Sequence, residues 1–255
     1  MYIIYAIIAF SVLIIVHELG HFIMAKLNNV MVEEFSLGMG PKIIGIQGRE
    51  TKYLIKAFPI GGYVKMLGDE SASTDPRAFN NKKPLQKLSI VVAGPIMNLI
   101  LGILLFAVVS SYKGYMAPVI DKLTDNGPAK SAGLLPGDTL LKINNSRIST
   151  WEDFATGVYT SNGMPVTITY SRNNNVNTLK MTPIKDVEEN RFIVGIYPTE
   201  ITSPSIAQSI KYGLNESWSL TKQTAGFFKT LFTGKASMND FGGPVTIIKF
   251  SGAAA

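Results

Sequence analysis

The 255-residue sequence contains no cysteine and has only two histidines. Without cysteine the chain can form no disulfide and can offer no thiolate to a metal, so any metal site must be built from histidine and carboxylate. Charge is also missing from two long stretches. Residues 1–25 carry His17, Glu18 and His21 as their only acidic, basic or imidazole side chains, and residues 88–112 carry none.

Each of these two apolar stretches can supply the ~20 residues that a helix needs to cross the hydrocarbon core of a bilayer. The overall composition agrees, because 46% hydrophobic residues is high for a soluble protein. A cleaved signal peptide is the alternative for the first stretch, but residues 1–10 contain no Lys or Arg and no small-residue cleavage site follows. We therefore expect two transmembrane helices, at residues 1–27 and 88–112.

The net charge of +6 is unevenly distributed. Residues 28–87 contain nine Lys and Arg against six Asp and Glu, whereas residues 113–200 contain nine of each. A basic excess beside membrane helices marks the cytoplasmic side. We predict that residues 28–87 are cytoplasmic and residues 113–200 extracytoplasmic, and that the lipid bilayer, with no nucleic acid, accounts for the basic charge.

Residues 35–67 are rich in glycine and in alternating apolar residues, which is typical of short strands joined by glycine turns. We expect Gly61 and Gly62 to form a tight bend. A sheet this apolar beside two membrane helices can enter the bilayer only if its backbone groups are paired.

Residues 113–200 have the pattern of a compact α+β domain. The segments VIDKLT, TLLKIN, VTITY, NTLKM and FIVGIYP predict strands, with VTITY and NTLKM paired across the NNN turn. Ser149 and Glu152 are expected to form the capping box of a helix that runs through Phe154 and Val158.

Residues 201–235 place apolar side chains near one face of a helix that several lysines interrupt. An amphipathic helix in the membrane interface fits this pattern, with a surface helix of the preceding domain as the alternative. Residues 236–255 resemble the start of a further membrane segment.

The segment His17-Glu18-Leu19-Gly20-His21 carries the most specific chemical signal. Residues four apart lie on one face of a helix, so the two imidazoles can bind one zinc ion, and Glu18 can take a proton from a water that the metal activates. Ionisable groups inside an apolar helix cost several kcal/mol unless they are paired or bound to metal. The alternative is a pair of histidines that are hydrogen-bonded inside a helix bundle.

The motif in a first transmembrane helix resembles the site-2 protease family. The segments FSLGMGPKI, FPIGGYVKMLGDE and AFNNKKPLQKLSIVVAGPIMN resemble its RseP/RasP branch in the same order, and AGLLPGD with VGIYP resembles the PDZ domain of that branch. The resemblance implies an α-helical membrane protein with a membrane-associated β-hairpin or sheet and an inserted α+β PDZ-like domain.

The resemblance also implies roles for single residues. His17 and His21 would bind Zn²⁺, and Glu18 would be the general base. Asn98, in the Gly-Pro-x-x-Asn element of the second helix, matches a position that engages substrate near the metal; an amide that bonds between helices is the alternative.

The stretch Gly61, Gly62, Tyr63 and Val64 matches the membrane-associated hairpin of the family, which could hold an extended substrate by β-augmentation; a plain packed hairpin is the alternative. The groove beside Val194, Gly195 and Ile196 would bind an exposed chain end, or the PDZ-like unit would act as a size filter.

One feature of the family pattern is missing. The third zinc ligand of the family is an Asp in a Leu-Asp-Gly motif on a later helix, and residues 1–255 do not contain that motif. Asp240 stands before the expected helix without it. Because zinc sites of this kind use three protein ligands, we expect the chain to be a fragment of a longer protease.

The resemblance thus predicts a multi-pass zinc endopeptidase of the bacterial inner membrane. Its substrates would be single-pass membrane proteins, such as anti-sigma factors, or remnant signal peptides. A catalytically inactive membrane adaptor whose PDZ-like domain binds partners is one alternative, and a soluble-type metalloprotease with a membrane anchor is another.

Overall fold

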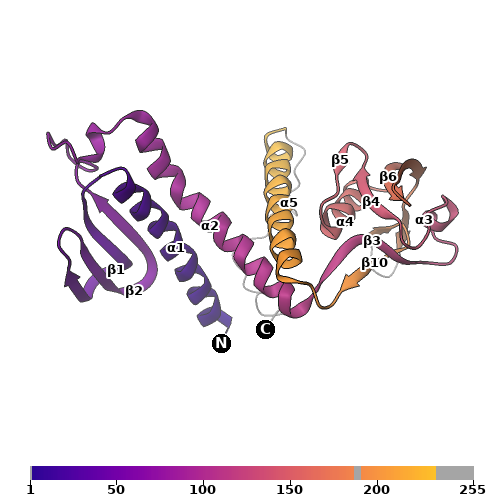
Figure 1. Ribbon diagram of the computed structural model, residues 1–255, viewed down its shortest axis with the longest axis horizontal. Coiled ribbons are helices and arrows are strands. Elements are labelled where there is room, and N and C mark those ends of the chain that lie inside the picture. Colours follow the sequence, from indigo (N-terminus) through magenta and orange to yellow (C-terminus); the bar gives the residue numbers. More distant parts are fainter. Residues whose placement is uncertain (1, 187–190, 234–255) are drawn as a thin grey trace. The chain divides into compact units, whose positions relative to one another are not determined.

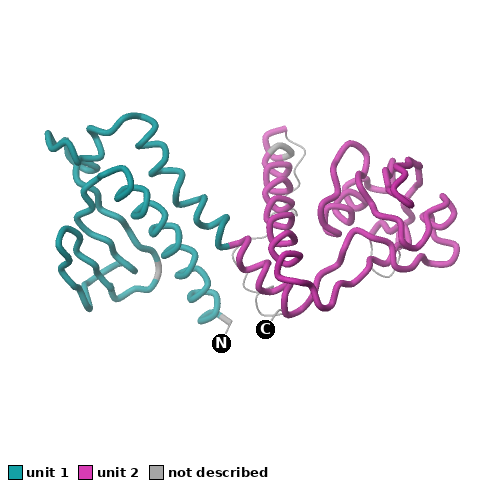
Figure 2. Tube along the Cα trace, in the orientation of Figure 1, with its two compact units in different colours: residues 1–101, 236–255 teal, residues 102–235 magenta. Residues whose placement is uncertain are grey.

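The computed structural model describes residues 2–186 and 191–233, and the chain divides into two compact units (Figures 1 and 2). The first unit comprises residues 1–101 with 236–255, and the second comprises residues 102–235. The predicted start of a further membrane segment at 236–255, including Asp240, lies outside the described residues.

Two long helices dominate the first unit and its boundary. Helix α1 spans Tyr2–Leu27, and helix α2 spans Pro84–Lys113, where it passes into the second unit. Both are long and apolar enough to cross a membrane. The second helix begins four residues before the predicted span. Its first residue is a proline, which is favourable there because an N–H at this position would have no hydrogen-bond acceptor within the helix. Gly114, with a φ of 76°, ends it.

The sheet of the first unit consists of β1 (Val32–Gln47) and β2 (Lys52–Met66). Both strands bend, so that residues 32–37 pair with 62–66 on one side and with 52–55 on the other, while residues 42–47 pair with 52–56. The bend expected at Gly61 and Gly62 is confirmed. Residues 52–55 run in the same direction as residues 34–37 and residues 62–65 run against them, so β2 reverses direction between residues 56 and 62, with Gly61 at a φ of 94°. The turn that joins β1 to β2 is a separate one, at residues 48–51.

An ion cluster holds the turn of this sheet. Glu50 accepts hydrogen bonds from Lys26 at the end of α1 and from Arg77 in the loop before α2, each at 2.6 Å. These bonds lower the pKa of Glu50 to about 2, although partial burial opposes the shift. Beside the cluster, Thr51 donates to the carbonyl of Val32. The turn is therefore tied to three segments that are distant in sequence.

The second unit contains the predicted α+β domain. Its main sheet has the strand order β10-β3-β4-β6-β7, with β5 beside β4, and β8 pairs with β9. The elements are β3 (Tyr115–Leu123), α3 (Pro128–Ser131), β4 (Thr139–Ile143), β5 (Ser146–Arg147), α4 (Trp151–Thr160), β6 (Val166–Arg172), β7 (Asn175–Met181), β8 (Ile184–Asp186), β9 (Arg191–Ile193) and β10 (Ile196–Ile201). The core between sheet and helices is apolar, with Ile120, Leu134, Leu140 and Ile168 almost fully buried.

Local predictions within this domain met different outcomes. The hairpin β6–β7 is confirmed, because Asn173 and Asn174 both have positive φ, at 50° and 64°, as a two-residue hairpin turn requires. The capping box is one residue later than predicted: Thr150 caps α4 and Asp153 completes the box. The FIVGIYP strand is interrupted by Gly195, with a φ of 76°, which separates β9 from β10.

Helix α5 (Ile206–Phe232) packs its small and polar residues inward. A Cβ added at Gly213 would lie 2.4 Å from the carbonyl oxygen of Ile103, so α5 touches the last turns of α2 there. Ser209, Glu216 and Ser219 are buried. The apolar side chains of Ile206, Ile210, Leu214 and Trp218 are instead exposed. The predicted amphipathic helix is present, five residues later than its expected start, and its placement in a membrane interface stays a prediction.

Candidate active site

Helix α1 brings the two histidines of the motif together. The Nε2 atoms of His17 and His21 are 3.1 Å apart, and the rings meet edge to face with centroids 4.8 Å apart. Zinc holds imidazole nitrogens at about 2.0–2.1 Å in tetrahedral geometry, which places two such nitrogens roughly 3.3 Å from each other. The two lone-pair positions therefore converge at the spacing that a shared metal ion needs.

Glycines make the space for this pair. A Cβ added at Gly94 of α2 would lie 2.5 Å from the Nε2 of His21 and 2.7 Å from the Nε2 of His17. A Cβ added at Gly20 would lie 2.5 Å from the carbonyl oxygen of Ala93. Small residues of this kind let two apolar helices approach closely. Any side chain at position 94 would occupy the place where the histidine nitrogens meet.

Groups on α2 contact the outer nitrogen of each imidazole. The Nδ1 of His21 lies 2.7 Å from the carbonyl oxygen of Ile90, and the Nδ1 of His17 lies 3.4 Å from the side-chain amide of Asn98. Pro95 lies inside the same stretch of helix and lacks an N–H, which weakens the backbone hydrogen bonding at this turn. Outer partners of this kind orient metal-binding histidines.

Strand β2 passes beside the predicted general base. A Cβ added at Gly62 would lie 3.2 Å from the Cγ of Glu18 on α1 and 2.9 Å from the carbonyl oxygen of Ser36 on β1, so the absence of a side chain at this position leaves room for both neighbours. The hydroxyl of Ser11 donates to the carbonyl of Pro59 at the bend of β2. The structure thus brings the predicted hairpin segment and the His-Glu-x-x-His helix together.

The other residues of the predicted segment 61–64 have structural partners. The hydroxyl of Tyr63 donates to the carboxylate of Glu34, and the ammonium of Lys56 donates to the same hydroxyl at 3.1 Å. The bond from Tyr63 lowers the pKa of Glu34, against a smaller opposing effect of burial. Val64 is buried in the small apolar cluster of the first unit. Within this segment, Gly62 lies against Glu18.

The donor set fits a divalent cation in part. Two imidazoles and a nearby carboxylate suit Zn²⁺, which takes nitrogen and oxygen ligands. Among residues 2–186 and 191–233 there is no cluster of three His, Cys, Asp or Glu side chains that could hold a metal. The described residues thus supply two ligands, and the third ligand of the family pattern is not among them.

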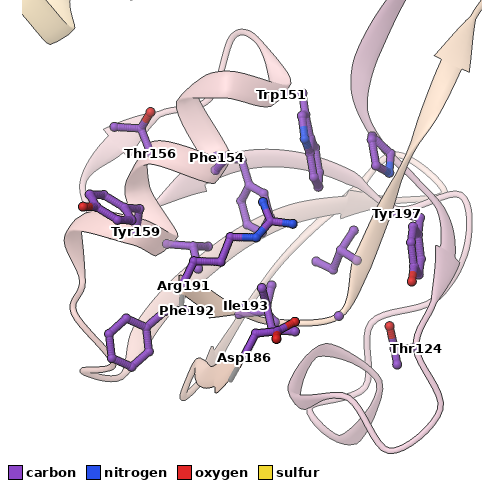
Figure 3. A pocket seen from close by; sticks show the side chains of 16 residues that line it. Thr124, Trp151, Phe154, Thr156, Tyr159, Asp186, Arg191, Phe192, Ile193 and Tyr197 are labelled. Atoms are coloured by element: carbon purple, nitrogen blue, oxygen red, sulfur yellow. The ribbon is translucent and has the colours of Figure 1, made fainter. Parts of the chain in front are cut away.

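The predicted groove residues of the second unit also come together. Val194, Gly195 and Ile196 line a cavity of about 640 Å³, which Figure 3 shows between helix α4 and the segment from β9 to β10. Trp151, Phe154, Thr156 and Tyr159 contribute from the helix. Strand β10 is at one end of the sheet order, with β3 on one side. An edge strand beside a cavity can accept a further strand.

Three residues at the histidine pair were not singled out from sequence. Gly94 lies in the noted Gly-Pro-x-x-Asn element, and a glycine followed by proline inside an apolar helix could have indicated a close approach. Gly20 lies inside the motif itself. Ile90 acts through its backbone carbonyl, which no side-chain pattern reveals.

Two helical imidazoles that converge on one point, with a carboxylate after the first of them, form the arrangement that metallopeptidases with a His-Glu-x-x-His motif use. The model of Peptidase family M50 matches residues 5–255, and the chain belongs to this family. Its M50 relatives include a protein of Clostridium acetobutylicum that is named as a zinc metalloprotease. The two are 49% identical over 99% of this chain and 75% of the relative.

Other relatives agree. A protein of Clostridium perfringens, also named as a zinc metalloprotease, is 44% identical over 100% of this chain and 76% of its own length. The protease named eep of Enterococcus faecalis is 30% identical over 96% of this chain and 78% of its own length. Among solved structures, the PDZ domain of an SdrC-like protein from Listeria monocytogenes is 17% identical. The match covers 33% of the present chain and 90% of the Listeria chain, with a TM-score of 0.30.

Proposed function

We propose that this M50 peptidase is an intramembrane zinc endopeptidase that cleaves transmembrane segments of single-pass membrane proteins. Anti-sigma factors and remnant signal peptides are the substrate class that the sequence resemblance implies. The observation that carries the proposal is the convergence of His17 and His21 at 3.1 Å inside an apolar helix, with Glu18 beside them.

The position of the site along α1 supports an intramembrane reaction. His21 and His17 lie six and ten residues before Leu27, the last residue of the candidate span. At 1.5 Å per residue this is roughly 9–15 Å along the helix, well inside a hydrocarbon layer of ~30 Å. The outward side chains of α1 and α2 are largely exposed aliphatic groups, such as Ile4, Ile8, Leu104 and Val108, which favour lipid over water.

His17 and His21 would hold the zinc ion through their Nε2 atoms. When bound there, zinc supplies a Lewis acid that polarises a scissile carbonyl and makes water acidic enough to attack it. Glu18 accepts the proton of the attacking water and returns it to the leaving amine. The contact of α1 with α2 and β2 limits the access of bulk water to this reaction.

A transmembrane substrate must lose its helical hydrogen bonds before its backbone can be cut. Residues 62–66 of β2 pair with residues 32–37 on one side, and Gly62 lies next to Glu18. We assign this segment the task of holding an extended substrate by strand addition. The cavity beside Val194, Gly195 and Ile196 would admit an exposed chain end, and the PDZ-like domain would lie outside the cytoplasm.

Replacement of Glu18 by Gln tests the proposal, because Gln fills the same space and cannot accept a proton. We expect Glu18→Gln to lower the cleavage rate of a reconstituted membrane substrate by at least ~100-fold, with zinc content and melting temperature unchanged. Undiminished cleavage would contradict the assignment of Glu18. If a wild-type protein that includes the third ligand of the family pattern held no zinc and cleaved nothing, the adaptor alternative, in which the groove binds partners, would replace the enzyme.

A further inference from the structure

The histidine pair raises a question of proton placement. Two neutral imidazoles can face each other at 3.1 Å through their Nε2 atoms in two ways. Either one Nε2 carries a proton and donates to the other, or both present lone pairs and a cation between them relieves the repulsion. The first arrangement needs no metal and the second requires one. The group at each outer nitrogen decides which arrangement forms.

The outer partner of His21 fixes the tautomer of its ring. The Nδ1 of His21 is 2.7 Å from the carbonyl oxygen of Ile90, which can only accept a hydrogen bond. In the neutral ring, Nδ1 therefore carries the proton and Nε2 presents its lone pair. His21 is fixed in the metal-binding tautomer by the backbone of α2.

The outer partner of His17 allows both arrangements. Its Nδ1 is 3.4 Å from the amide nitrogen of Asn98, and the Oδ1 of Asn98 is buried without a hydrogen-bond partner among the described residues. An amide can rotate by 180° about its last bond, which exchanges its oxygen and nitrogen. When the nitrogen faces His17, the ring must accept at Nδ1 and carry its proton on Nε2. When the oxygen faces His17, the proton lies on Nδ1 and the lone pair of Nε2 is free.

We propose that Asn98 is a positioning residue whose side-chain oxygen accepts the Nδ1 proton of His17, so that both imidazoles present Nε2 lone pairs to one metal ion. This inference rests on the proposed function, since it concerns the same zinc centre. It gives Asn98 a different task from the substrate contact that the sequence resemblance implied. It also gives the buried Oδ1 atom a hydrogen-bond partner in the metal-loaded protein.

Two substitutions of similar size separate the alternatives. Asn98→Asp keeps an acceptor and removes the donor, whereas Asn98→Leu removes both. A carboxylate at position 98 lies behind the ring of His17, away from the converging Nε2 atoms, so it acts on the tautomer and not as a ligand. Each variant is made in a version of the protein that includes the third ligand of the family pattern, and is titrated in detergent micelles with Co²⁺, which reports binding by its visible spectrum, and with Zn²⁺ in competition.

We expect Asn98→Leu to weaken Co²⁺ and Zn²⁺ binding by ~10–100-fold, the usual effect of losing an outer partner of a metal-binding histidine. Asn98→Asp should bind the metals about as tightly as the wild type. A substrate-contacting Asn98 predicts the opposite pattern, in which both variants bind metal normally and cleave slowly. That pattern would overturn the inference.

Imidazole ¹⁵N spectra provide a second readout, which is simple because the chain contains two histidines. In the zinc-loaded wild type and in Asn98→Asp, both rings should carry their proton on Nδ1. Without metal, the ring of His17 should keep its proton on Nδ1 in Asn98→Asp and carry it on Nε2 in Asn98→Leu. The same His17 tautomer in both metal-free variants would also overturn the inference while leaving the enzyme proposal intact. Failure of the wild-type protein that includes the third ligand to bind either metal would instead overturn the proposed function.

Discussion

The domain of the second unit and the long helices of the first unit differ in which side chains they expose. In the domain of the second unit, the core is aliphatic and aromatic, and the surface carries most of the charge. In the first unit the imidazoles and a carboxylate face inward between α1, α2 and β2, while aliphatic side chains of both helices face outward. The first unit has the pattern suited to lipid, and the domain has the pattern suited to water.

Helix α5 belongs to the second unit but follows the first pattern. Its buried side includes Ser209, Glu216, Ser217 and Ser219, and its exposed side includes Trp218, which is 60% exposed. The contrast is therefore between surfaces and not simply between units. Inward polarity has a cost wherever a buried group lacks a partner. The following changes test such a group, two close glycine contacts and one paired carboxylate.

The largest expected effect is at the histidine pair. Gly94→Ala places a methyl group within 2.5–2.7 Å of both Nε2 atoms, so we expect metal affinity to fall by more than ~100-fold while the second unit stays folded. The measurement is Co²⁺ titration together with circular dichroism. Gly102→Ala is the matched control on the same helix, because its Cβ would meet only the Oγ of Ser217, at 3.8 Å. Normal metal binding by Gly94→Ala would show that the metal does not lie between these rings.

The next effect concerns Glu216, which is 5% exposed and has one carboxylate oxygen without a described partner. Burial, and after it the charge of Glu152, raises the pKa of Glu216 to about 7. The folded state therefore holds a proton that the unfolded state releases near pH 4.5. Stability from this group is complete below that pH and falls as the pH rises to about 7, by on the order of 2–3 kcal/mol.

Glu216→Gln should remove this fall and raise the melting temperature at pH 8 but not at pH 4.5. The groups that face Glu216 include Thr150, Glu152 and Asp153 of α4 and its cap, and Tyr212 of α5 itself. Glu200→Gln on β10 serves as a control at an exposed carboxylate. An equal stabilisation at both pH values would contradict the buried-proton explanation.

A smaller effect is expected at the contact of α5 with α2. Gly213→Ala would bring a Cβ within 2.4 Å of the carbonyl oxygen of Ile103. We expect this to lower the free energy of unfolding by about 1–3 kcal/mol, because the clash is with a backbone atom, which can move only if the helix shifts. Hydrogen exchange of α5 amides measures it. Gly226→Ala meets nothing within 4 Å and should stabilise the same helix slightly. Similar exchange in both variants would place α5 away from α2.

The smallest effect is expected at the sheet turn. Glu50 has a lowered pKa, so its stabilising contribution is present above about pH 4.5 and is lost as the pH falls toward 2. Glu50→Gln should lower the melting temperature at pH 7 by a few degrees at most, since the pair is partly exposed. The difference from the wild type should shrink as the pH is lowered, and a constant difference would contradict this assignment.

Local patterns were predictable from sequence where neighbouring residues decide the structure. The motif on α1 and the Asn173–Asn174 turn are of this kind. The cap of α4 was misplaced by one residue because Ser149 and Thr150 can both cap a helix, and Glu152 and Asp153 can both complete the box. The double pairing of residues 32–37 was not predictable, since it depends on contacts between distant segments. The contact between the carbonyl of Ile90 and the ring of His21 was not predictable for the same reason.

The ion cluster at Glu50 joins three places that a sliding motion of the long helices would have to separate. Lys26 ends α1, Arg77 precedes α2, and both bind the carboxylate at the turn between β1 and β2. This cluster therefore acts as a brace at the cytoplasmic margin of our proposed orientation. Through these contacts the end of α1 and the loop before α2 are attached to the same turn, away from the histidine pair.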